Sequence, residues 1–193
     1  LLWNIMYRMP IRSYTLTLSG NKSVYGRSTY AYNTIYDLSG SSTSLTANLS
    51  KILYRNNKSK LTGNIEIKRK NTKSYFEDVK LTDRNLTIGI VGINYDFVLF
   101  KGVSGLSFSY SKGMRILHGE KDIEKGEKTP KAEATRYNGS FYWYKPIGNV
   151  TLRLTGEIQS SKDVNYGSEK ITIGGIGSVP GYQYDNISGD SGY

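Results

Sequence analysis

The chain has 193 residues, no cysteine and a net charge of +10, from 26 Lys and Arg against 16 Asp and Glu. The lack of cysteine excludes disulfides and thiolate metal sites, and the lack of a long apolar run excludes a transmembrane helix. The basic excess is compatible with nucleic-acid binding but is more typical of solvated loops and faces. The 17 tyrosines are unusual for a soluble domain and typical of a membrane barrel with aromatic girdles.

Alternation of apolar and polar residues predicts about eight β-strands, each long enough to cross a membrane obliquely. In chain order we expect them at residues 1–9, 12–25, 44–54, 59–71, 85–97, 103–115, 135–145 and 149–160. The fourth strand shows the pattern clearly, because Leu61, Ile65 and Ile67 alternate with polar residues. A soluble β-sandwich alternates in the same way, so this periodicity alone leaves both classes open.

The connections between these strands are expected to alternate in length. Short turns at residues 10–11, 55–58, 98–102 and 146–148 are each followed by a longer stretch, at residues 26–43, 72–84, 116–134 and from 161 onward. Such a rhythm gathers all turns at one end of the sheet and all long loops at the other, as in outer-membrane barrels. It favours an antiparallel membrane meander over a sandwich with Greek-key crossings.

In a barrel, the polar residues of each strand line a wet lumen while the apolar residues face lipid. We expect four charged residues on the lumen wall: Glu66, Lys68, Arg153 and Glu157. We interpret these residues as paired polar groups of the wall rather than as general acids.

No pattern in the chain predicts catalysis, a metal or a cofactor. His118, the single histidine, has no cysteine or carboxylate at ligand spacing. The glycines at residues 174–177 follow no parallel strand and open no helix, as a phosphate-binding loop would require. Ser191 lies in an Asp-Ser-Gly run without triad partners. The basic residues 68–70 lack the interleaved aromatic residues typical of nucleic-acid binding.

The C-terminal segment differs from the strands before it. Six glycines and one proline between Gly174 and Tyr193 are incompatible with a regular helix or strand ladder. A long segment of this kind after regular strands is usually functional or disordered. The chain also begins at Leu1 without a methionine or a leader and stops at the start of a further strand, so we expect a piece of a longer polypeptide.

The run YGSEKITIGGIGSVPGY at residues 166–182, followed by SGDSGY at residues 188–193, resembles the signature loop of the two-partner secretion transporters. These are haemolysin-activator-like outer-membrane proteins related to the barrel-assembly factor. The resemblance extends more weakly to residues 53–56 and 75–81. The residues that carry the loop motif are Val179, Pro180, Gly181, Tyr182, Gly189, Asp190 and Gly192.

The resemblance implies an all-β fold in which these strands are part of a sixteen-stranded transmembrane barrel. Residues 1–160 would supply roughly the fourth to eleventh strands. Residues 161–193 would form an extracellular loop that folds into the lumen, followed by the start of the next strand. In the family, periplasmic transport domains precede the barrel.

The resemblance also implies a function without enzyme chemistry. The protein would secrete a large β-helical exoprotein across the outer membrane of a Gram-negative-type bacterium. Its partners would be the lipid bilayer and the exoprotein, with no nucleic acid, small-molecule substrate or cofactor. A barrel-assembly factor or a porin-like barrel is the alternative within membrane proteins, and a soluble, tyrosine-rich adhesion domain is the alternative outside them.

Two positions depart from the family pattern. Pro180 stands where the family has an arginine that pairs with acids of the wall and holds the loop in place, and proline offers neither a charge nor a donor. Ser191 replaces a second common arginine. Asp190 lies between glycines, where a turn residue and a loop anchor fit equally well.

Overall fold

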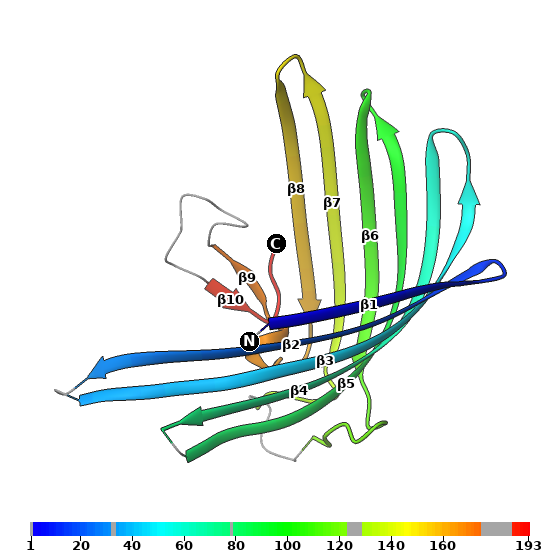
Figure 1. Cartoon of the computed structure of the whole chain (residues 1–193). Helices are drawn as coiled ribbons and strands as arrows, with labels where there is room; N and C mark the ends of the chain where they lie inside the picture. Colours follow the sequence, from blue (N-terminus) through cyan, green and yellow to red (C-terminus); the bar gives the residue numbers. More distant parts are fainter. Residues whose placement is uncertain (1, 32–33, 78, 123–128, 175–186) are drawn as a thin grey trace.

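A computed structural model describes residues 2–31, 34–77, 79–122, 129–174 and 187–193 (Figure 1). The described residues form eight long strands, followed by a 3-10 turn and two short strands. The long strands are β1 (Leu2–Ile11), β2 (Tyr14–Ala31), β3 (Thr34–Arg55), β4 (Ser59–Phe76), β5 (Val79–Leu99), β6 (Gly102–Gly113), β7 (Thr135–Ile147) and β8 (Val150–Ser161). The short elements are η1 (Gly167–Glu169), β9 (Ile171–Ile173) and β10 (Ile187–Gly189).

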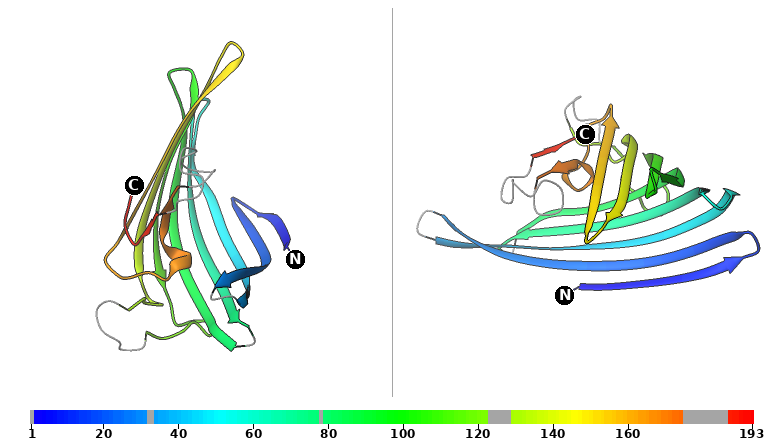
Figure 2. Two further views of the ribbon diagram at one scale, coloured as in Figure 1. Left: turned by 90° about the vertical axis from the view of Figure 1, so that its left-hand side faces the viewer. Right: turned by 90° about the horizontal axis from the view of Figure 1, so that it is seen from above.

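Each long strand pairs in antiparallel fashion with the next, so the sheet runs β1 to β8 without a crossover. The predicted all-β antiparallel meander of about eight strands is therefore confirmed. The sheet is strongly bent, and the segment after β8 lies on its concave side (Figure 2). We call this side the inner face and the convex side the outer face. No helix among the described residues is long and apolar enough to cross a membrane.

The two faces differ sharply in chemistry because the strand register aligns residues of one kind. Leu49, Ile65 and Val91 are neighbours across β3, β4 and β5 on the outer face. One residue along, Asn48 and Glu66 are paired on the inner face. Ile65 is 60% exposed and Val91 is 54% exposed. An apolar face left open in this way fits contact with lipid rather than with a second sheet.

The buried apolar residues of the described chain lie elsewhere. They are Leu86, Ile88, Ala132 and Ala134. All four line a small cavity together with residues of the segment after β8. The core of the described residues therefore sits under that segment, on the inner face.

Two of the four predicted long connections are wrong. Gly26 pairs with Ser39 and Thr72 pairs with Arg84, so residues 26–43 and 72–84 belong almost entirely to paired strands. These segments are mostly polar and lack a regular alternation of apolar and polar residues, so periodicity could not reveal them. The long connections that follow β6 and β8, which begin at residues 114 and 162, are as expected.

The strands that include these segments are longer than a bilayer requires. β3 has 22 residues, about 75 Å at the usual rise of a strand, whereas about 9–11 residues suffice to span the hydrocarbon core. The short turns at residues 12–13, 56–58, 100–101 and 148–149 close the opposite end of the sheet. Strands β2–β5 therefore project beyond the span of a bilayer, at the end of the sheet that also carries the segment after β8.

Candidate functional site

The segment after β8 leaves the sheet and returns to the edge of the same strand. The backbone N–H of Gln159 donates to the Gly192 carbonyl at 2.8 Å, and the Gly192 N–H donates to the Gln159 carbonyl at 2.9 Å. The Ser191 hydroxyl accepts from the Ser161 N–H at 2.9 Å and donates to the Ser161 carbonyl. We call the described residues between these points, 162–174 and 187–191, the loop base.

The loop base rests in the bend of the sheet. Figure 1 shows β9 and β10 in the angle between β2 and β8. β9 and β10 pair with each other through Ile171–Gly189, Thr172–Ser188 and Ile173–Ile187. Contacts from β4, β5, β7 and β8, described next, hold the loop base against the inner face.

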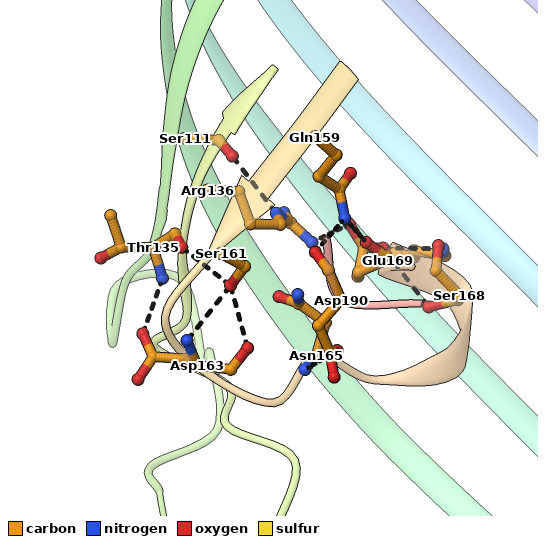
Figure 3. Close-up of polar contacts among 11 residues, drawn as sticks. Ser111, Thr135, Arg136, Gln159, Ser161, Asp163, Asn165, Ser168, Glu169 and Asp190 are labelled. Carbon is orange, nitrogen blue, oxygen red and sulfur yellow. Dashed lines mark hydrogen bonds and ion pairs between the residues drawn. The ribbon is translucent and has the colours of Figure 1, made fainter. Parts of the chain in front are cut away.

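Glu169 makes the central contact between the loop base and the sheet. Its Oε1 lies 2.9 Å from Lys70 Nζ on β4, and its Oε2 lies 2.7 Å from Arg136 Nη1 on β7. Arg136 also donates from Nε to the Ser111 hydroxyl on β6 at 3.3 Å (Figure 3). The side chains of Glu169, Lys70 and Arg136 are only 13%, 15% and 8% exposed. One carboxylate therefore joins two strands that are not neighbours.

The charges at this site are complementary. Burial favours the neutral acid and pushes the pKa of Glu169 upward, but Lys70 and Arg136 outweigh it and hold the pKa below its ordinary value. Lys68 acts in the same direction from the same strand as Lys70. Glu169 is therefore ionised at neutral pH, with each oxygen facing a cation.

Two further contacts fix the first part of the loop base. The guanidinium of Arg84 on β5 lies 3.6 Å from the centre of the Tyr166 ring, in a cation–π arrangement. Asp163 accepts from Lys131 Nζ at 2.7 Å and from the Thr135 N–H at 3.0 Å. The hydrogen bond from Lys131 lowers the pKa of Asp163. These contacts connect the loop base to β5 and to the start of β7.

Gln159 connects the two arms of the loop base. Its Nε2 donates to the Glu169 carbonyl at 3.2 Å and to the Asp190 carbonyl at 3.0 Å (Figure 3). The Asp190 carboxylate accepts from the Asn165 N–H at 2.6 Å and lies 3.6 Å from Lys170 Nζ. Asp190 thus contacts the other arm of the loop base in addition to lying between glycines.

The structure places the remaining motif residues as follows. Gly189 lies in β10 and pairs with Ile171, and a side chain at Gly192 would come within 3.1 Å of Ile171. Val179, Pro180, Gly181 and Tyr182 lie outside the described residues, so their predicted position in a lumen stays a prediction.

The four predicted wall residues all lie on the inner face but are not brought together. Glu66 accepts from the Asn48 side chain at 3.1 Å, and Arg153 lies 5.5 Å from the Tyr144 ring. Glu157 lines a polar hollow of about 350 Å³ beneath β9. Among the described residues, no ion pair joins either glutamate to Lys68 or Arg153.

Sequence reasoning missed Glu169 and its two partners as site residues. Lys70 and Arg136 lie 99 and 33 residues from Glu169 in the chain, and no local pattern relates them. The available signal was the position of Glu169 inside the run that resembles the family's loop. Within the described residues, no group of three or more His, Asp or Glu is arranged to hold a metal ion.

Comparisons with known proteins agree with this architecture. The chain is 26% identical over 190 residues to the outer membrane transporter CdiB of Dickeya dadantii (strain 3937), covering 96% of this chain and 34% of that protein. It is 31% identical over 149 residues to the outer membrane transporter CdiB of Escherichia coli strain 536, covering 75% and 25%. The chain thus spans at most about a third of the length of these curated relatives.

A solved structure of CdiB from Escherichia coli superposes with a TM-score of 0.92 at 23% identity, covering 98% of this chain and 36% of that one. This likeness concerns the fold. The model of the haemolysin secretion/activation protein family ShlB/FhaC/HecB matches residues 3–193. Since that match covers nearly the whole sequence, the chain belongs to the ShlB/FhaC/HecB family of haemolysin secretion/activation proteins.

Proposed function

We propose that the chain contributes barrel strands and a loop to a transporter that secretes a large exoprotein across the outer membrane. The observation that carries this proposal is the family match over residues 3–193. The relatives that match are named outer membrane transporters, and the chain is itself an outer-membrane protein of their family. The exported partner would be a large β-helical protein of the haemolysin or adhesin kind.

The chemistry of the two faces supports this function. The outer face offers apolar residues such as Ile65 and Val91 to lipid. The inner face offers hydroxyls, amides and scattered charges, among them Glu66, Arg153 and Glu157. A wall of this composition stays wet and makes weak, exchangeable hydrogen bonds with a passing polypeptide. The function requires no catalytic residue, metal or cofactor.

The arrangement within a whole barrel is part of the same proposal. The eight strands would be the fourth to eleventh of sixteen, and residues 161–193 would be an extracellular loop that enters the lumen and leads into the next strand. The return of Gly192 to the edge of β8 supports the last point, because a strand that continued from there would pair with β8. Residues 179–182 would form the tip of the loop inside the lumen.

Deletion of the gene tests the function directly. The proteins released into the medium and displayed on the cell surface are compared by mass spectrometry between the parent, the deletion strain and a complemented strain. We expect one large exoprotein to disappear from the surface and medium and to return on complementation.

The other outcomes separate the alternatives. Reduced levels of many outer-membrane proteins would indicate a barrel-assembly factor, and loss of small-solute permeability alone would indicate a porin. Recovery of the protein as a soluble monomer without detergent would indicate the adhesion domain. An unchanged set of exported proteins would contradict the proposed secretion function.

A further inference from the structure

We propose that Lys70 and Arg136 form a carboxylate-binding latch on the inner face, which Glu169 fills, and that this latch positions the loop base. Glu169 is a positioning residue in this proposal: it sets how often the loop base leaves the bend of the sheet. The consequence for transport rests on the proposed function, because a loop base that stays in place narrows the path of a passing polypeptide.

The latch connects two strands of the sheet that do not pair with each other. β4 and β7 are three strand steps apart, about 14 Å along the sheet at the usual spacing. Only two long basic side chains that converge from both sides can reach one carboxylate across that span. Lys70 also donates to the Ser168 carbonyl at 3.3 Å, which fixes the backbone beside Glu169. The latch therefore acts on the loop base and on the bend of the sheet together.

Loss of the Glu169 charge with the loop base still in place would leave Lys70 and Arg136 facing a neutral group. Among the described residues, Arg136 would keep the Ser111 hydroxyl at 3.3 Å as a partner, with its side chain 8% exposed. A buried charge without a counter-charge is strongly unfavourable. Neutralising Glu169 therefore destabilises the docked loop base by more than the lost attraction.

One buried residue of the loop base opposes docking. The Asn165 side chain is 1% exposed, and neither its Nδ2 nor its Oδ1 has a hydrogen-bond partner among the described residues. Leaving such groups without partners favours undocking, because water would satisfy them. The charged contacts of the loop base, of which Glu169 makes two, offset this cost.

A buried thiol at position 165 reports undocking without any exported partner. The sequence contains no cysteine, so Asn165→Cys introduces the single thiol of this stretch, and it also removes the unsatisfied amide. The protein as expressed from its gene is purified in detergent and treated with a maleimide, and the labelled peptide is quantified over time. Labelling then follows the fraction of molecules in which the loop base is open.

Glu169→Gln in the Asn165→Cys background should raise the labelling rate about 10- to 100-fold, as expected for loss of charge-assisted hydrogen bonds. Asp83→Asn is the matched control. It also converts a carboxylate in a 3.0 Å lysine pair to an amide, but its partner Lys80 lies away from the loop base and is exposed. This control should label at the parent rate.

A second substitution gives a result that a general packing defect would not. Adding Arg136→Gln to Glu169→Gln removes the unpaired buried cation, so labelling should fall back toward the parent rate instead of rising further. Lys70→Gln alone keeps the Arg136 contact and should give an intermediate rate.

Equal labelling of the parent and Glu169→Gln proteins would overturn the latch. If Glu169→Gln does not reach the outer membrane, the labelling rate of Lys70→Gln is the test. A rate equal to that of the parent would then overturn the latch. Labelling can be measured without the exoprotein. If labelling behaves as described but deletion of the gene leaves the exported proteins unchanged, the proposed secretion function is contradicted and the latch is not.

Discussion

A pair of arginine substitutions in β4 tests which face of the sheet meets lipid. Ile65 lies at the centre of the apolar run of β4 and projects from the outer face between Leu49 and Val91. Thr62 lies on the opposite face, three residues away, and lines a polar hollow with Asn64. The two positions lie in the same strand, three residues apart, but they differ in the medium that we expect around them.

The expected cost follows from the exposure of Ile65. Full burial of an isoleucine is worth about 1.5–3 kcal/mol, and Ile65 presents 60% of its surface outward, so losing that contact with lipid costs about 1–2 kcal/mol. A guanidinium on the lipid face near the midplane adds about 2–4 kcal/mol. Ile65→Arg should therefore lower the free energy of unfolding by about 3–6 kcal/mol, and Thr62→Arg by less than about 0.5 kcal/mol.

The measurement is urea unfolding of the protein in phosphatidylcholine vesicles, followed by heat-modifiable migration on gels. Ile67→Arg, nearer the end of the apolar run, should cost less than Ile65→Arg, because the cost falls toward the interface. Equal losses at Ile65 and Thr62 would show that both faces meet the same medium. That result would refute the assignment of the outer face to lipid.

Three further predictions concern the loop base and the sheet beneath it. Tyr166→Leu should open the loop base about 2- to 30-fold more often, as measured by thiol labelling, because it removes the cation–π contact with Arg84, whereas Tyr166→Phe should not. Gly113→Ala should lower the folded yield on gels, since its Cβ would overlap the backbone of the β6–β7 connection, whereas Gly156→Ala meets no atom within 4 Å and should be neutral. Docking lowers the pKa of Glu169, so its stabilisation is complete above the ordinary glutamate value of about 4.3 and is lost as the pH falls through the lower docked value. Hydrogen exchange of residues 162–174, corrected for intrinsic rates, should therefore accelerate in acid, and Glu169→Gln should show no such dependence.

Strands were predictable from the sequence only where one face meets an apolar medium. Residues 59–71 and 149–160 were assigned to strands because leucine and isoleucine alternate with polar residues there. β4 contains the first range, and β8 begins one residue later than the second. Residues 26–43 carry mostly Ser, Thr, Tyr and Gly on both faces, so neither face differs from the other. Their pairing depends on backbone hydrogen bonds between β2 and β3, which leave no periodic trace in side-chain polarity.

The candidate site was predictable only in part, for a related reason. The resemblance of the loop motif singled out Asp190, which accepts from Asn165 across the loop base, and Gly192, which pairs with Gln159 at the edge of β8. Glu169 gained its importance from Lys70 and Arg136, which the fold brings to it from β4 and β7. Opposite charges far apart in a sequence are common. Only the bend of the sheet brings these three residues into contact.

The outer face also marks where the bilayer should end, and this explains why the projecting strands stay polar. One row across the sheet contains Ile5, Gly20 and Leu45. The next row toward the projecting end contains Trp3, Lys22 and Thr43. A tryptophan beside a lysine is typical of the headgroup layer, where an aromatic ring and a snorkelling ammonium both find suitable surroundings. Beyond this row a strand gains nothing from an apolar face, because water lies on both sides.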